Sequence, residues 1–119
     1  MIACNNENSE PTERAFSILN DWSDIESTSE TGLWLIYFYH PGCPACAEVE
    51  PDVKAFNNLM GEQYPVYLAH SHQVTGTRPD ADIRYVPTIV VVEGNNYQSF
   101  HTGVPAIRSL LGSLTESDD

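Results

Sequence analysis

An apolar run that ends in a turn and a pair of cysteines most constrains what this chain can fold into. The run, Leu33 to Tyr39, is rich in aromatic residues. Seven such residues suit a buried strand and are too few for a helix of ordinary length. His40-Pro41-Gly42 then breaks the strand, because proline lacks an N–H and glycine permits a sharp turn. Cys43-Pro44-Ala45-Cys46 comes next and opens a predicted helix, since proline suits the first helical position.

Two cysteines with this spacing at the start of a helix predict a redox-active pair. The unpaired N–H groups and the positive end of the helix dipole favour a thiolate over a thiol. Cys43 is expected to be the more exposed cysteine and the attacking nucleophile. Cys46, one turn further on, is expected to resolve a mixed disulfide by displacing the substrate thiol.

Half of a zinc site is the alternative interpretation of this pair, and it needs two more ligands. No second C-x-x-C and no H-x-x-x-H accompanies the motif, so we expect no metal. The remaining candidate ligands are Cys4, His40, His70, His72 and His101. Cys4 lies in a polar stretch and is expected to be a bystander, with a regulatory or intermolecular disulfide as the alternative.

Composition bounds the class of protein. The 119 residues suit one domain with its own core, and no apolar run approaches the ~20 residues of a membrane-spanning helix. The net charge of −12 argues against binding to nucleic acid or to an anionic membrane, both of which need a basic patch. The N-terminus lacks a basic and then apolar leader, so a cytoplasmic location is expected if Met1 is the native start.

The flanking sequence predicts alternating strands and helices. We expect a flexible acidic tail over residues 1–14, a domain over 15–115 and a C-terminal tail over 116–119. Inside the domain, β-branched and apolar runs predict strands, and apolar residues three and four apart predict helices. The expected strands are 15–19, 33–39, 64–70, 88–93 and 97–102; the expected helices start near 21, 44 and 104, with a loop or short helix over 72–84.

With these elements in place, the chain resembles the thioredoxin family over roughly residues 15–115. The Cys43 to Cys46 motif resembles the family's C-x-x-C after its central strand, and Pro51 falls where thioredoxins kink the active-site helix. The segment 83–88 matches the family's segment with a cis-proline opposite the active site, here Pro87. Gly103 matches the glycine between the last strand and the last helix.

The resemblance implies an α/β thioredoxin fold, with a central mixed five-stranded sheet flanked by about four helices. It implies a cis bond before Pro87, which leaves the backbone of Val86 free to pair with an extended substrate. Val86, Pro87, Gly42 and Gly103 are thus the expected substrate-binding residues, and Pro44 and Ala45 are expected to tune the cysteines.

Three positions depart from the family pattern. Gly42 replaces the tryptophan that shields the site, Tyr37 replaces the buried aspartate, and Leu68 replaces the nearby lysine. Because that aspartate is thought to take the proton of the second cysteine, we expect water or the Tyr37 hydroxyl to do so here. His40, three residues before Cys43, is either a protonated group that stabilises the thiolate or a solvated loop residue.

The function implied by the resemblance is a protein thiol–disulfide oxidoreductase that reduces protein disulfides through Cys43 and Cys46. No cofactor is needed. The expected partners are disulfide-bearing proteins and a thioredoxin reductase or similar electron donor, with the protein a monomer. The alternatives are a disulfide oxidant or isomerase of the same fold, and a non-catalytic thioredoxin-like binding module.

Overall fold

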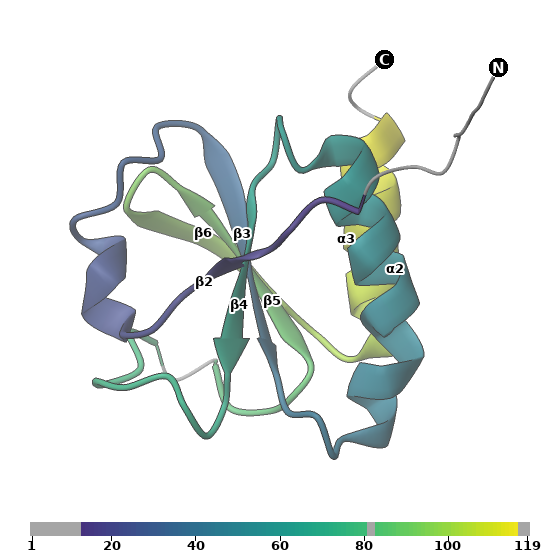
Figure 1. The fold of residues 1–119 in the computed structure, drawn as a ribbon, viewed down its shortest axis with the longest axis horizontal. Helices are drawn as coiled ribbons and strands as arrows, with labels where there is room; N and C mark the ends of the chain where they lie inside the picture. Colours follow the sequence, from purple (N-terminus) through teal and green to yellow (C-terminus); the bar gives the residue numbers. More distant parts are fainter. Residues whose placement is uncertain (1–12, 81–82, 117–119) are drawn as a thin grey trace, which may run out of the picture.

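The computed structural model describes residues 13–80 and 83–116. The tails expected over residues 1–14 and 116–119 fall almost wholly outside these residues, as does Cys4. Five strands, one 3-10 helix and two α-helices follow in order (Figure 1): β2 (Ser17–Ile18), η1 (Trp22–Ile25), β3 (Leu33–Tyr39), α2 (Pro44–Met60), β4 (Val66–His70), β5 (Thr88–Glu93), β6 (Asn96–Thr102) and α3 (Val104–Glu116).

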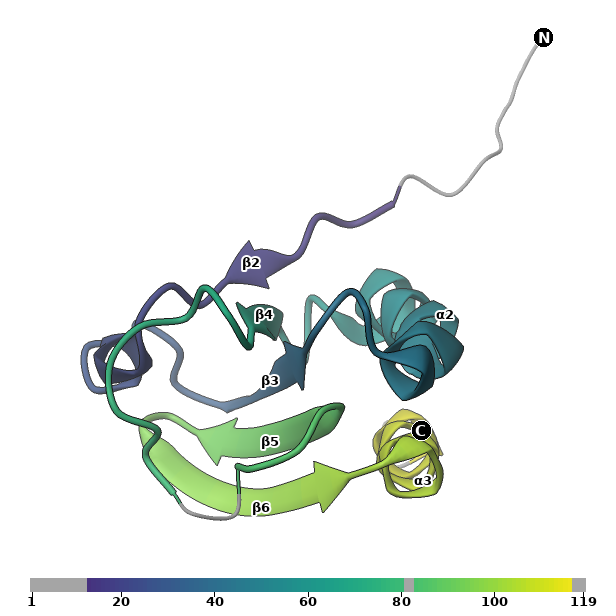
Figure 2. The same ribbon diagram turned by 90° about the horizontal axis from the view of Figure 1, so that it is seen from below.

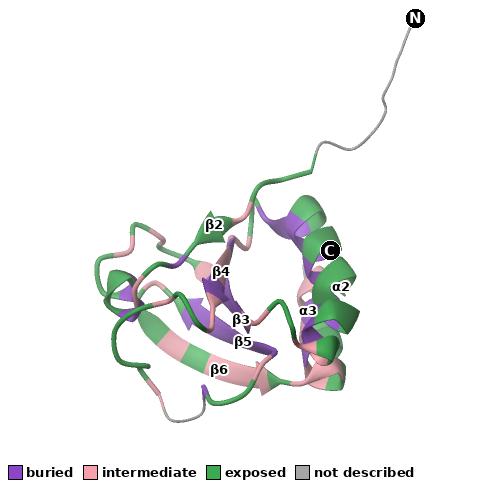
Figure 3. Ribbon diagram, turned by 60° about the horizontal axis from the view of Figure 1, so that its bottom comes forward, coloured by how far each residue is buried: buried purple, intermediate pink, exposed green. Residues whose placement is uncertain are grey.

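The expected mixed five-stranded sheet is confirmed, with strand order β2-β4-β3-β5-β6. The apolar run β3 lies at its centre, parallel to β4 and antiparallel to β5. A central strand is covered on both faces, and the five consecutive residues Trp34 to Phe38 are all buried. This is why β3 is apolar throughout instead of alternating. Figure 3 shows the buried residues concentrated in β3, β5 and the inner side of α2.

The two faces of the sheet are covered differently (Figure 2). Helices α2 and α3 pack together on one face, where Val49, Val53 and Phe56 of α2 meet Tyr37 and Ile89 of the sheet. The other face is covered by η1 and by the segment that follows β4. Its core includes the following buried residues: Leu19, Trp22, Ile25, Trp34, Ile36, Phe38, Ala69, Ile83, Val90 and Val92.

The expectation of about four helices is wrong, because the described residues hold two α-helices and one 3-10 turn. Asp21 does cap the first segment, accepting from the N–H of Ser23, but only Trp22 and Ile25 are buried there. Two apolar residues anchor a single turn and do not offset the cost of starting a longer helix. The described part of 72–84 is also not helical; it contains Gly76 at a φ of +86° and Pro79.

Helix α2 has the expected extent, from Pro44 at its first position to Gly61 at its C-cap. Pro51 lies inside it and cannot donate to the carbonyl four residues earlier. None of the helices in residues 13–80 and 83–116 is both long and apolar enough to cross a membrane.

Truncating a leucine under α2 should test the core. Leu35→Ala removes a fully buried side chain of β3, whereas Leu59→Ala removes a leucine of α2 that is 70% exposed. We expect Leu35→Ala to lower the free energy of unfolding by about 3 kcal/mol in urea, and Leu59→Ala by less than about 0.5 kcal/mol. Equal losses from the two substitutions would contradict the burial pattern.

Candidate active site

Cys43 forms the N-cap of α2, with its sulfur in the place of the usual capping oxygen. Cys43 Sγ accepts a hydrogen bond from the backbone N–H of Cys46 at 3.1 Å. The Cys43 carbonyl accepts the first helical bond, from the N–H of Ala47 at 3.0 Å. Pro44 holds the first helical position and has no N–H to satisfy. Negative charge on Sγ would therefore be stabilised by a donated N–H and by the helix dipole.

Cys46 has a different environment one turn along α2. Cys43 is half-buried, whereas Cys46 is only 4% exposed, and both are free thiols. Burial, and secondarily the hydrogen bond to Cys43, raises the pKa of Cys46 to about 11. Cys46 is therefore a protonated thiol at neutral pH. The pair thus combines an accessible sulfur that faces an N–H donor with a buried sulfur that would have to lose a proton before it could act as a nucleophile.

The segment before β5 lies against Cys43. The Val86–Pro87 peptide bond is cis, and the Val86 carbonyl oxygen lies 3.8 Å from Cys43 Sγ. The Pro87 carbonyl accepts a hydrogen bond from the N–H of Gly103 at 3.0 Å. Gly103 has a φ of +93°, a backbone conformation that glycine adopts without strain. Three segments distant in sequence therefore meet here: the start of α2, the Val86–Pro87 bond and the turn before α3.

Gly42 is exposed at the rim of the site and is tied to His40. Its N–H donates to His40 Nδ1 at 3.1 Å. The N–H of Cys43 donates to the His40 carbonyl at 3.1 Å. His40 thus fixes the turn that carries Cys43 by accepting two hydrogen bonds, one on its ring and one on its backbone carbonyl.

Three histidines cluster beside this turn. His40 Nε2 lies 3.0 Å from His72 Nδ1, and the N–H of His72 donates to His70 Nδ1 at 3.1 Å. The spacing of these histidines along the sequence did not predict that they would cluster. The signal for it was strand order: β3 and β4 are parallel neighbours with Tyr39 opposite His70, so the residues after both strands end together.

The cluster fixes the protonation state of His40. Because Nδ1 accepts from Gly42, the neutral ring carries its proton on Nε2 and donates it to His72. Desolvation, and then His72 and His70, lower the pKa of His40. A neutral ring at pH 7 supplies no positive charge to a Cys43 thiolate. Among residues 13–80 and 83–116, no three histidine, cysteine or acidic side chains are arranged to hold a metal ion.

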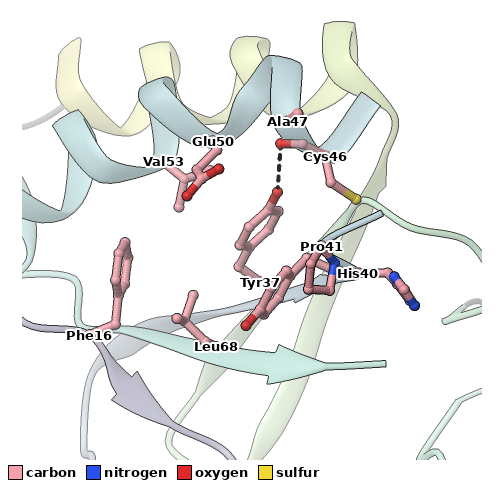
Figure 4. A pocket seen from close by; sticks show the side chains of 10 residues that line it. Phe16, Tyr37, His40, Pro41, Cys46, Ala47, Glu50, Val53 and Leu68 are labelled. Carbon is pink, nitrogen blue, oxygen red and sulfur yellow. Dashed lines mark hydrogen bonds between the residues drawn. The ribbon is translucent and has the colours of Figure 1, made fainter. Parts of the chain in front are cut away.

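Tyr37 occupies the interior of the site, between β3 and α2. Its hydroxyl donates to the Cys46 carbonyl at 3.2 Å, and its ring stacks on Tyr39 at 5.3 Å between centroids. Burial, followed by the charges of Cys46 and Glu50, raises the pKa of Tyr37 above its ordinary value. A cavity of about 310 Å³ opens around this ring (Figure 4), lined by Phe16, Tyr37, Tyr39, His40, Pro41, Cys46, Ala47, Glu50, Val53 and Leu68.

The two cysteines should differ in alkylation. At pH 8, substoichiometric iodoacetamide should label Cys43 and spare Cys46, because Cys46 is buried and its pKa is about 11. Labelling of Cys46 should appear as the pH approaches that value. Peptide mass spectrometry after quenching measures the labelled fraction of each cysteine. Equal labelling of Cys43 and Cys46 at pH 8 would contradict the difference in their burial and pKa.

His40 should titrate below the ordinary imidazole pKa of about 6.5. Between the ordinary pKa of the unfolded state and the lowered pKa of the native state, the His40 of the unfolded state binds more protons than that of the native state. The free energy of unfolding should therefore fall as the pH falls through this window. Long-range ¹H–¹⁵N NMR should show the Nε2–H tautomer above this window. His72→Asn should raise the pKa of His40, whereas His101→Asn, on β6, should leave it unchanged; the reverse pattern would contradict the cluster.

The chain is similar to known proteins both in sequence pattern and in fold. The sequence model of the thioredoxin family matches residues 20–115, which is well over half of the chain. No curated protein sequence matches. Among solved structures, the thioredoxin Mala s 13 of Malassezia sympodialis is similar, with a TM-score of 0.73 and 13% identity over 90% of this chain and 96% of that one. A Fasciola hepatica thioredoxin has a TM-score of 0.69 and 16% identity over 82% and 98%. These likenesses to solved structures show the fold, and the match over residues 20–115 shows the family: the chain belongs to the thioredoxin family.

Proposed function

We propose that this protein is a thiol–disulfide oxidoreductase that reduces protein disulfides through Cys43 and Cys46. The observation that carries the proposal is the position of Cys43 Sγ at the N-terminus of α2. There it accepts the Cys46 N–H and lies one helical turn from a buried, protonated thiol. A thiolate is the attacking species in thiol–disulfide exchange, and this position stabilises one.

The reaction has two exchanges. The Cys43 thiolate attacks one sulfur of the substrate disulfide, forming a mixed disulfide and releasing the other substrate sulfur as a thiolate that takes a proton from water. Cys46 then loses its proton and attacks Cys43 Sγ. The bond between Cys43 and the substrate breaks, and the Cys43–Cys46 disulfide forms. Two electrons pass to the substrate, and the protein is left oxidised.

Substrate binding is assigned to the surface around Cys43. An extended segment of the substrate would pair with the backbone of Val86, whose carbonyl lies 3.8 Å from Cys43 Sγ. Pro87 is buried and fixes that edge, and the Gly103 turn is joined to it through the Pro87 carbonyl. Gly42, exposed and without a side chain, leaves the approach to Cys43 open.

The electron balance of the proposed reaction indicates which partner proteins it requires. Each turnover oxidises the cysteine pair, so a reductase of the thioredoxin reductase kind must return two electrons. The protein would act as a monomer on disulfide-bearing proteins. A reductant of this type requires a reducing compartment, and we propose the cytoplasm.

Serine substitutions should separate the two cysteines. With a disulfide-bearing protein as substrate, Cys43→Ser should abolish reduction, whereas Cys46→Ser should accumulate a mixed disulfide through Cys43 visible by mass spectrometry. Retention of the cellular function by Cys43→Ser would contradict the proposal in favour of a binding module.

The reduction potential should fix the direction of exchange. Equilibration in thiol buffers, followed by alkylation and mass measurement, should give a potential near or below about −250 mV for a reductant. A potential above about −200 mV would overturn the proposed direction and indicate an oxidant or isomerase.

A further inference from the structure

We propose that Glu50 takes up the proton of Cys46 during the second exchange, through water held in the cavity beside Tyr37. This inference rests on the proposed function and assigns a proton-transfer role to a residue one turn beyond the cysteine pair. Glu50 lines the same cavity as Cys46 and Tyr37. Figure 4 shows the side chains of Glu50 and Cys46 descending from α2 on either side of the Tyr37 hydroxyl.

The need for an acceptor comes from the burial of Cys46. Its side chain is 4% exposed, so its thiol has little direct contact with bulk water. It must nevertheless become a thiolate to attack Cys43. The cavity of about 310 Å³ connects the thiol to other groups and is large enough for several water molecules. Water there would find polar partners in the Tyr37 hydroxyl, the Cys46 thiol and the Glu50 carboxylate.

The other polar groups on the cavity wall are poorer acceptors. The hydroxyls of Tyr37 and Tyr39 are phenols, which are neutral and weakly basic at pH 7. Both ring nitrogens of His40 are engaged, Nδ1 with the N–H of Gly42 and Nε2 with His72. Among the residues that line the cavity, Glu50 is the one carboxylate.

Glu50 is also placed to return the proton to solvent. Its side chain is 55% exposed, so the carboxylate sits at the mouth of the cavity. It lies 3.4 Å from Lys54, an ion pair between two exposed groups that is weak enough to exchange with water. The closeness of Glu50 to the interior is seen in its effect on Tyr37, whose pKa its charge helps to raise.

The Cys46 S–H bond breaks, its proton passes through water to a Glu50 oxygen, and the sulfur keeps the electron pair. That sulfur bonds to Cys43 Sγ as the bond from Cys43 to the substrate sulfur breaks. The departing substrate thiolate takes a proton from water, and Glu50 releases its own to solvent. The titratable or charged groups around this route are Tyr37, Tyr39, His40, Cys43 and Lys54.

The experiment measures the second exchange separately from the first. Reduced protein is mixed with a disulfide-bearing protein, quenched with acid at intervals and analysed by mass spectrometry for the mixed disulfide. Glu50→Gln removes the acceptor. Glu48→Gln is the matched control, because it removes the same charge from the same helix at an exposed residue that pairs with Arg108, outside the cavity.

At pH 7 we expect Glu50→Gln to resolve the mixed disulfide about tenfold more slowly than wild type, with the first exchange unchanged and the intermediate accumulating. The deficit should shrink as the pH rises, because hydroxide then removes the proton. Glu50→Asp should recover part of the rate, and acetate added to Glu50→Ala should do the same. Glu48→Gln should resolve at the wild-type rate.

Equal resolution by Glu50→Gln and Glu48→Gln, or a deficit that does not change with pH, would overturn the role of Glu50 while leaving the proposed function intact. A wild-type protein that leaves the substrate disulfide unreduced, together with a Cys46→Ser protein that traps no mixed disulfide, would instead overturn the proposed function. The thermal unfolding midpoint of each variant excludes misfolding as the cause, and the acetate rescue of Glu50→Ala remains informative if Glu50→Gln is unstable.

Discussion

The hydrogen bond from the Cys46 N–H to Cys43 Sγ joins the folding of α2 to the chemistry of its N-cap residue. A helix needs acceptors for its first N–H groups, and here a sulfur supplies one. The same contact would stabilise that sulfur as an anion, so the cap of the helix and the proposed nucleophile are one atom. The following turn buries Cys46 under the helix, which raises its pKa and keeps the second sulfur protonated at neutral pH. The two cysteines differ because one caps the helix and the other faces its core.

The sheet supplies the rigid support for this arrangement. Because β3 lies at the centre of five strands, the turn that follows it is anchored on both sides, by β4 and by β5. The segment from Val86 to Thr88 enters β5 next to the end of β3, since Phe38 lies opposite Thr88. The Val86 carbonyl therefore meets Cys43 through strand pairing, although 43 residues separate them. Among the described residues, the face of the sheet away from α2 and α3 carries one 3-10 turn and loops.

The interior behind Cys46 holds two of the three departures from the family pattern that the sequence indicated. Tyr37 and Leu68 replace the acid and base that the resemblance implied, and both line the cavity beside Cys46. A phenol that donates to the Cys46 carbonyl orients the start of α2 but is a weak proton acceptor. A carboxylate is nonetheless present on the cavity wall, supplied by α2 at Glu50 instead of by β3. In the proposed exchange, the burial of Cys46 creates the need for a base, and α2 offers a position for that base which β3 does not.

The resemblance to the thioredoxin family implied the mixed five-stranded sheet. The sequence by itself determined the central strand, the β-branched strand over 88–93 and the cysteine pair at the start of a helix. These follow from local rules, because an apolar run of seven, a proline at the first helical position and a β-branched run each favour one backbone conformation. It overestimated the helices, because Trp22 and Ile25 satisfy a helical spacing that one 3-10 turn also satisfies. Only the tertiary structure decided which groups surround the sulfurs. The histidine cluster depends on β3 and β4 ending together, and the position of Glu50 beside Tyr37 depends on how α2 packs on the sheet. Such contacts join residues whose spacing along the chain carries no record of their distance in space.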